Sequence, residues 1–153
     1  MGTAEQEETF SDIRQGIRRL CARFPGAYWQ ELDAERRYPT DFVNALASEG
    51  WLSVLIPEEY GGSGLGLAAA TAVLEEVHCS GCNGGAAHAQ MYTMGTVLRH
   101  GSEEQKERYL PKIASGELRL QAFGVTEPTS GTDTTRIRTF AKRDGDDYVV
   151  NGQ

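Results

Sequence analysis

Long hydrophobic runs and clusters of positive charge are both missing from this 153-residue sequence. No apolar run approaches the ~18 residues that a membrane-spanning helix needs, so we expect no membrane span. The 15 Lys and Arg residues are outnumbered by 22 Asp and Glu residues, giving a net charge of −7 without a basic stripe, and we therefore expect no nucleic-acid partner. Residues 1–8 are acidic, unlike a secretory or transit segment, which favours a soluble cytoplasmic protein.

Cysteine is scarce, and its three positions, Cys21, Cys79 and Cys82, give an odd count outside a secretory context. We therefore predict free thiols rather than a disulfide framework. Cys79 and Cys82 form a C-x-x-C pair near His78 and His88, which raises zinc binding or thiol redox chemistry as an alternative. No second ligand pair follows, and the pair falls at a helix end instead of after a strand, so we predict no metal and favour packing by small residues.

Apolar residues recur at spacings of three and four through the first two thirds of the chain, which is typical of amphipathic helices. Gly50 is suited to a left-handed helix end, and Ser102 with Gln105 predicts a capping box. Between the helices, residues 51–57 are continuously apolar and residues 58–66 form a glycine-rich loop. The pattern predicts six helices, over residues 5–24, 28–37, 40–49, 67–79, 86–100 and from 102 to about 116.

After residue 117 the periodicity changes from helix to strand. Residues 118–125 alternate and then become apolar, which predicts a strand entering a core. Residues 136–143 and 147–151 predict two β arms around a turn at 144–146. The fold class is therefore α+β, with an all-α N-terminal domain over 1–117 and the beginning of an antiparallel β domain over 118–153.

The strand-like approach breaks at residues 123–133 into a run of hydroxyl, small and acidic residues. Thr126 and Thr132 offer groups that donate or accept hydrogen bonds, and Gly131 allows a ligand to approach the backbone closely. A planar heterocycle with imide edges, or a pyrophosphate, would suit this set. The alternative is a polar surface loop after a strand.

The turn resembles the signature of the acyl-CoA dehydrogenase family, in which a small residue and an aliphatic residue precede Thr-Glu, two free positions, and small-Gly-Ser/Thr-Asp. Arg136 departs from the family, which usually has a small residue there. The Pro-Glu-x-Tyr-Gly-Gly-x-Gly loop at 57–64 and the segments 101–106 and 110–117 match the family independently. The signature is matched by Gly124, Val125, Thr126, Glu127, Ser130, Gly131, Thr132 and Asp133.

A second glycine motif, Gly64-Leu65-Gly66 with Ala69, fits the dinucleotide-binding fingerprint by spacing alone. That fingerprint requires a preceding strand and a following βαβ unit, whereas the sequence that follows is helical. We therefore reject a Rossmann site here.

The resemblance implies FAD-dependent oxidation of an acyl-CoA across its α and β carbons. Carried over by position, it places Phe123 near the flavin, and it assigns Val125 and Thr126 to the pyrimidine edge. It further assigns Gly131 and Thr132 to the FAD pyrophosphate, and Thr132 also to the acyl-CoA. Glu127 and Asp133 fit a structural role better than a catalytic one, because acids beside a turn commonly cap backbone N–H groups. The helix with Met91, Tyr92 and Met94 corresponds to one that lines the acyl-chain cavity, although ordinary core packing explains these residues equally well.

The resembling enzymes are more than twice as long, so we expect an N-terminal portion that lacks the C-terminal helical bundle, contains no catalytic base and is inactive alone. The implied partners are an acyl-CoA substrate from fatty acid metabolism, an electron-transfer flavoprotein as acceptor, and further copies of the chain in a homo-oligomer, a dimer or tetramer. Two alternatives stay open: an acyl-CoA oxidase or other flavin enzyme of this fold, or a non-catalytic assembly or flavin-binding module. The acyl-chain length is not readable from the sequence.

Overall fold

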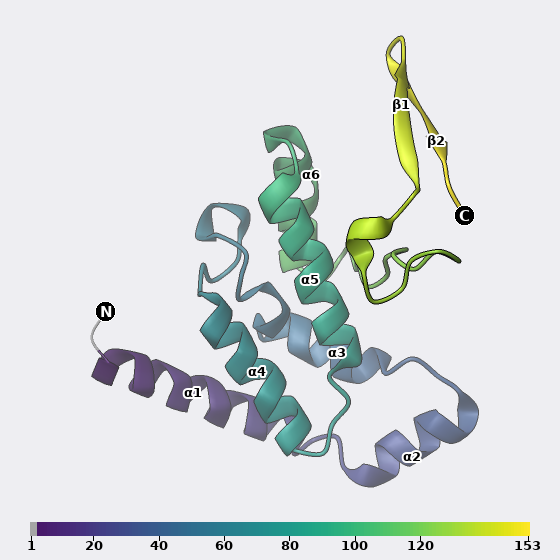
Figure 1. Cartoon of the computed structure of the whole chain (residues 1–153). Helices are drawn as coiled ribbons and strands as arrows, with labels where there is room; N and C mark the ends of the chain where they lie inside the picture. Colours follow the sequence, from purple (N-terminus) through teal and green to yellow (C-terminus); the bar gives the residue numbers. More distant parts are fainter. Residues whose placement is uncertain (1–2) are drawn as a thin grey trace. The chain divides into compact units, whose positions relative to one another are not determined.

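The computed structural model describes residues 3–153, which divide by their contacts into two compact units, one ending at Ala122 and the other running from Phe123 to Gln153. The boundary predicted after residue 117 stays a prediction. The first unit is helical and the second contains a β hairpin (Figure 1). The helices of the first unit are α1 (Thr3–Cys21), α2 (Gly26–Glu35), α3 (Thr40–Ser48), α4 (Leu67–Cys79), α5 (Gly85–His100) and α6 (Glu103–Ala114).

All six predicted helices are confirmed, with ends that differ by a few residues. Among residues 3–153, none of them is long and apolar enough to cross a membrane. Ser102 caps α6 as expected: its hydroxyl accepts a hydrogen bond from the Gln105 N–H, and the Gln105 side chain accepts one from the Ser102 N–H. Gly50 has the expected left-handed conformation, with φ of 80°.

The main core forms where α1 packs on α4 and α3 packs beside them. Ile17, Phe42 and Val73 are each at most 1% exposed, so apolar burial stabilises this contact. Glu76 on α4 is also buried, and its carboxylate accepts hydrogen bonds from the Arg18 guanidinium on α1 at 2.6 and 3.0 Å. A buried charge is tolerated here because it is paired and hydrogen-bonded.

A second cluster joins α5 and α6 to the loop that precedes α4. Its buried members are Ile56, Met94, Leu110 and Ile113. The continuously apolar segment forms the short 3₁₀ helix η1 (Trp51–Ser53), and the glycine-rich loop contains a second, η2 (Glu58–Tyr60). Gly62 is required where this loop folds back, because a Cβ there would lie 2.1 Å from the Ile56 carbonyl oxygen.

Residues 118–122 complete the helical unit as an irregular segment that contacts α3 and α5 through side-chain hydrogen bonds. The Thr93 hydroxyl on α5 donates to the Leu120 carbonyl, and the Arg119 guanidinium donates to the Asn44 side-chain oxygen on α3. The strand predicted over 118–125 is wrong. None of the described residues provides a neighbouring strand to pair with this backbone, and side chains take over that role.

The second unit contains an antiparallel hairpin of β1 (Phe140–Asp144) and β2 (Asp147–Asn151). Asp144 pairs with Asp147, so the turn consists of Gly145, with φ of 62°, and Asp146. The β arm predicted over 136–143 is four residues too long at its start. Residues Thr134–Arg136 instead form the 3₁₀ helix η3, which Asp133 caps. The α+β class is confirmed, as an all-α unit followed by the start of an antiparallel sheet.

Candidate functional site

The signature residues form a closed turn in the second unit. The Glu127 N–H donates to the Ser130 carbonyl at 2.9 Å, and the Ser130 N–H donates to the Glu127 carbonyl at 3.1 Å. Pro128 and Thr129 form the tip. Ser130 is the buried residue of this turn, and its hydroxyl donates to the Asp133 carbonyl at 2.7 Å. These bonds hold the turn and the start of η3 in one shape.

Both carboxylates of the turn are occupied by backbone N–H groups, as predicted for a structural role. Glu127 accepts from the N–H groups of Arg138 and Thr139 at 2.8 and 2.7 Å. Asp133 accepts from the Thr135 N–H at 3.2 Å. The hydrogen bond from the Thr139 side chain and those from the two backbone N–H groups lower the pKa of the Glu127 carboxyl. A carboxylate held in its charged form in this way is a poor general base, since its proton affinity is reduced.

The predicted ligand-binding groups are left free by this arrangement. The hydroxyls of Thr126 and Thr132 are exposed and make no hydrogen bond with any residue in the described part of the chain. A Cβ added at Gly131 would meet nothing within 4 Å, and its φ lies in the ordinary range. The structure thus leaves open space above the Gly131 backbone, and neither a close neighbour nor backbone strain requires a glycine there.

The turn's apolar approach is largely exposed. The Phe123 side chain is 58% exposed, an unusual state for a large aromatic side chain, and Val125 is half-buried. An exposed ring, two free hydroxyls and an open backbone form a donor and acceptor set that fits the imide edge and the pyrophosphate of FAD. All five predicted cofactor residues fall within one eleven-residue segment of the sequence, and their contacts with a flavin stay a prediction.

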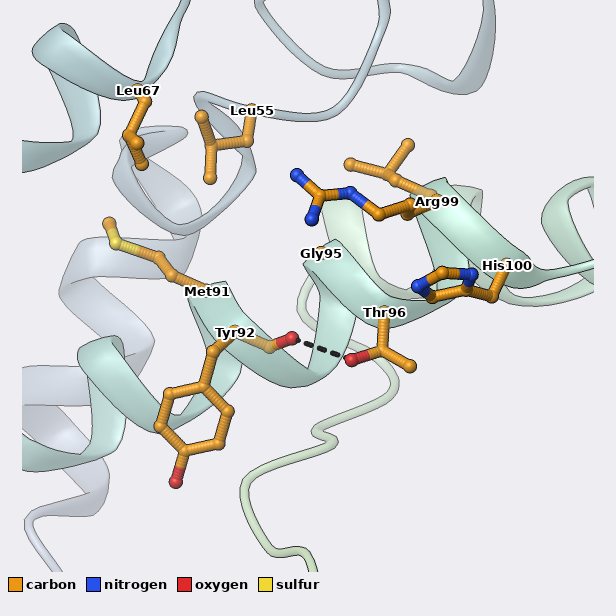
Figure 2. A pocket seen from close by; sticks show the side chains of 9 residues that line it. Leu55, Leu67, Met91, Tyr92, Gly95, Thr96, Arg99 and His100 are labelled. Carbon is orange, nitrogen blue, oxygen red and sulfur yellow. Dashed lines mark hydrogen bonds between the residues drawn. The ribbon is translucent and has the colours of Figure 1, made fainter. Parts of the chain in front are cut away.

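A separate hollow of about 590 Å³ lies in the helical unit beside the second half of α5 (Figure 2). Leu55, Leu67 and Met91 lie together at one end of it, and Arg99 and His100 lie at the other. The Thr96 hydroxyl in its wall donates to the Tyr92 carbonyl at 3.1 Å, so it is already satisfied within the helix (Figure 2).

Met91, Tyr92 and Met94 of α5, which the resemblance places on a cavity-lining helix, have different surroundings in the structure. Met91 and Tyr92 line the hollow, but Met91 is also buried in the main core, and Met94 is fully buried in the cluster with Leu110 and Ile113. Ordinary core packing, the alternative considered for this helix, is therefore correct for Met91 and Met94.

The cysteines are free thiols, as predicted. Cys79 is exposed, whereas Cys82 is buried and its thiol faces the carbonyl oxygens of Cys21 and Phe24, each 3.9 Å away. Burial raises the pKa of the Cys21 thiol to about 12, so it stays protonated and unreactive near neutral pH. The C-x-x-C pair is thus split between solvent and core, which is not the arrangement of two ligands on one ion.

One polar residue of the helical unit was overlooked in the sequence. Gln90 is fully buried in α5, and neither its Oε1 nor its Nε2 has a hydrogen-bond partner among the described residues. The available signal was its isolation, since it is a large amide within a stretch of small and apolar residues. A buried amide without a partner requires a physical explanation.

Comparison with known proteins identifies relatives over nearly the whole chain. The family model for the acyl-CoA dehydrogenase N-terminal domain matches residues 3–117. The acyl-CoA dehydrogenase fadE12 of Mycobacterium tuberculosis is 34% identical over 148 residues, which cover 94% of this chain and 38% of that protein. Mitochondrial isovaleryl-CoA dehydrogenase of Bos taurus is 34% identical over 150 residues, covering 95% of this chain and 35% of that protein.

Comparison with solved structures identifies the same family. The crystal structure of an acyl-CoA dehydrogenase from Geobacillus kaustophilus superposes with a TM-score of 0.78 at 28% identity, covering 94% of this chain and 38% of that one. The chain therefore spans less than two fifths of the length of the relatives it matches.

Proposed function

Because this chain belongs to the acyl-CoA dehydrogenase family, we propose that the protein carrying it oxidises an acyl-CoA thioester across its α and β carbons with FAD as cofactor. The single observation that supports this most strongly is the turn at 123–133. There the two acidic side chains are occupied by the backbone, while the hydroxyls of Thr126 and Thr132 are left free for a ligand.

FAD, when bound, supplies the acceptor for the substrate's β hydride. In this chain, the Val125 backbone and the Thr126 hydroxyl would bind the pyrimidine edge, with Phe123 beside the flavin. Gly131 and Thr132 would bind the pyrophosphate, and Thr132 would also contact the acyl-CoA. Such contacts orient the cofactor and lower the entropic part of the barrier by fixing the reactants in place.

We assign no residue of this chain as the catalytic base. Glu127 and Asp133 are the acids nearest in sequence to the proposed flavin contacts, and both are committed to backbone N–H groups. The depressed pKa of Glu127 further weakens it as a proton acceptor. The electron-transfer flavoprotein as acceptor, the homo-oligomeric state and the cytoplasmic location also stay predictions.

The flavin contact is tested by Thr126→Val in the full-length protein that carries this sequence. Valine keeps the shape of threonine and removes the hydroxyl, so losing one hydrogen bond of about 1 kcal/mol should weaken FAD binding roughly fivefold. Thr129→Val, at the exposed tip of the same turn, is the matched control and should bind FAD as the unaltered protein does. Equal FAD affinity in both variants would refute the role given to Thr126.

A second function, acyl-CoA oxidation by oxygen, uses the same fold and the same turn. The two are distinguished by how the reduced protein is reoxidised. We expect slow reaction with oxygen and fast reaction with an electron-transfer flavoprotein. Rapid reoxidation by air with formation of peroxide would replace the dehydrogenase proposal with the oxidase.

A further inference from the structure

Gly95 lies in the interior of α5, where glycine is less favourable than any other residue except proline. Its φ is not in the left-handed region, and a Cβ built on it would meet nothing within 4 Å. Neither the backbone conformation nor a close neighbour among the described residues therefore requires a glycine at this position. The missing side chain leaves open space in the wall of the hollow beside α5 (Figure 2).

Arg99 brings a positive charge to the same hollow. Met91, Gly95 and Arg99 are each four residues apart, so they share one face of α5. The Arg99 guanidinium extends back over Gly95 toward Leu55, the direction that long side chains usually take on a helix (Figure 2). It makes no hydrogen bond or ion pair with any residue in the described part of the chain.

The other end of the hollow is apolar. Leu67 begins α4 and is 74% exposed, Leu55 is half-buried, and Met91 is 5% exposed. Met91 and Arg99 are eight residues apart, a rise of ~12 Å along the helix axis, which suits an apolar tail of medium length. The volume of about 590 Å³ lies within the ~300–1,000 Å³ of most small-molecule sites.

The charge of Arg99 defines the head group of the ligand. Its planar guanidinium can donate two parallel N–H bonds to the two oxygens of a carboxylate, whereas an alcohol would leave the charge unpaired and a cation would be repelled. We propose that the hollow beside α5 binds a medium-chain aliphatic carboxylate, with its carboxylate on Arg99 and its tail against Leu55, Leu67 and Met91. This inference does not rest on the proposed function, because a plain acyl-CoA carries no charge at the end of its acyl chain.

Calorimetric titration of the full-length protein tests the head group with probes that share one eight-carbon tail. Octanoate should bind saturably at one site, octan-1-ol should bind at least ~5-fold more weakly, and octyltrimethylammonium should not bind. Equal affinity for octanoate and octan-1-ol would overturn the role of the charge. Binding of octyl phosphate in place of octanoate would overturn the choice of a carboxylate.

Two matched arginine variants locate the contact. Arg99→Gln should lower the affinity for octanoate ~5-fold and leave that for octan-1-ol unchanged, since a solvent-screened charge is lost while the apolar walls remain. Arg108, an exposed arginine of α6 whose guanidinium lies over the Tyr109 ring, supplies the control, and Arg108→Gln should bind octanoate as the unaltered protein does. Equal octanoate affinity in the two variants would overturn the assignment to Arg99.

Gly95→Leu fills the hollow and reports separately on folding. Leucine favours a helix more than glycine does, and its Cβ would meet nothing within 4 Å, so the unfolding temperature should stay the same or rise while octanoate binding is lost. A lower unfolding temperature would show that the rest of the full-length protein packs against Gly95, which would overturn the open hollow. Absence of saturable octanoate binding in the unaltered protein would do the same.

A competition experiment separates this inference from the proposed function. Octanoate should bind equally well in the presence of saturating octanoyl-CoA. Displacement of octanoate by octanoyl-CoA would overturn the inference, because it would assign the hollow to the acyl group of the substrate. If octanoate binds but no acyl-CoA reduces the flavin, the inference stands and the proposed function is refuted.

Discussion

The ion pair between α1 and α4 gives a prediction whose size follows from the structure. Glu76 is 4% exposed and accepts two close hydrogen bonds from Arg18, at 2.6 and 3.0 Å, and a longer one from Arg14 at 3.4 Å. Glu76→Gln keeps the side-chain shape and removes the charge. A charge-assisted bond contributes about 1.5–3 kcal/mol, and the Arg18 side chain is 63% exposed and screened by water, so we expect a loss of about 2 kcal/mol.

The loss of free energy is measured by urea unfolding followed by circular dichroism. In thermal unfolding, for a unit of this size, the same loss of about 2 kcal/mol corresponds to a fall of roughly 8 °C in Tm. Glu75→Gln is a control on the adjacent residue: its side chain is 55% exposed and pairs with Arg14 at 2.5 Å, and its loss should stay below about 0.5 kcal/mol. Equal losses in the two variants would refute the reasoning from burial.

The contribution of Glu76 to stability should change with pH in a definite direction. Hydrogen bonds from Arg18 lower the pKa of Glu76 in the folded protein below the ordinary value of 4.5. Its stabilising contribution is therefore complete above pH 4.5 and is lost as the pH falls through the folded pKa. The difference between the unaltered protein and Glu76→Gln should be full at about pH 7 and smaller at about pH 4. A difference that grows on acidification would contradict the ion pair.

Two further substitutions and one control test the helical unit. Gly116→Ala should lower the free energy of unfolding by about 1–3 kcal/mol, because the φ of Gly116 is 79° and the new Cβ would lie 2.9 Å from the Cβ of Ala47. Gly26→Ala is the control: the new Cβ would meet nothing within 4 Å, so this substitution should be neutral or stabilising. Ser102→Ala removes the cap that holds the Gln105 N–H and should cost about 1 kcal/mol. Urea unfolding measures these changes. An unchanged midpoint in the Gly116 variant or in the Ser102 variant would contradict the structural reason given for that residue.

The helices were predictable because their information is local. The apolar spacing along α4 and the Ser102–Gln105 box act within a few residues, so the sequence pattern reports them directly. The strand expected at 118–125 failed for the opposite reason. Strands form only with a partner, and here side chains such as Thr93 and Arg119 satisfy or anchor the segment in place of a ladder.

In the same way, some features of the candidate site and its surroundings could be predicted from the sequence and others could not. The structural role of Glu127 and Asp133 followed from general turn chemistry, and the hydrogen bonds to Arg138, Thr139 and Thr135 confirm it. The unpaired amide of Gln90 could not be predicted, because burial and the lack of a partner arise only when α5 packs between the two clusters.

The central claim is that the turn at 123–133 belongs to an enzyme that reduces FAD with an acyl-CoA. It is tested most directly by mixing the full-length, FAD-loaded protein with acyl-CoAs in the absence of oxygen and following the visible flavin absorbance. We predict that the absorbance is lost as the flavin is reduced, and that Thr126→Val needs more FAD to reach the same loading. A protein that binds no FAD, or whose flavin stays oxidised with every acyl-CoA, would contradict the account.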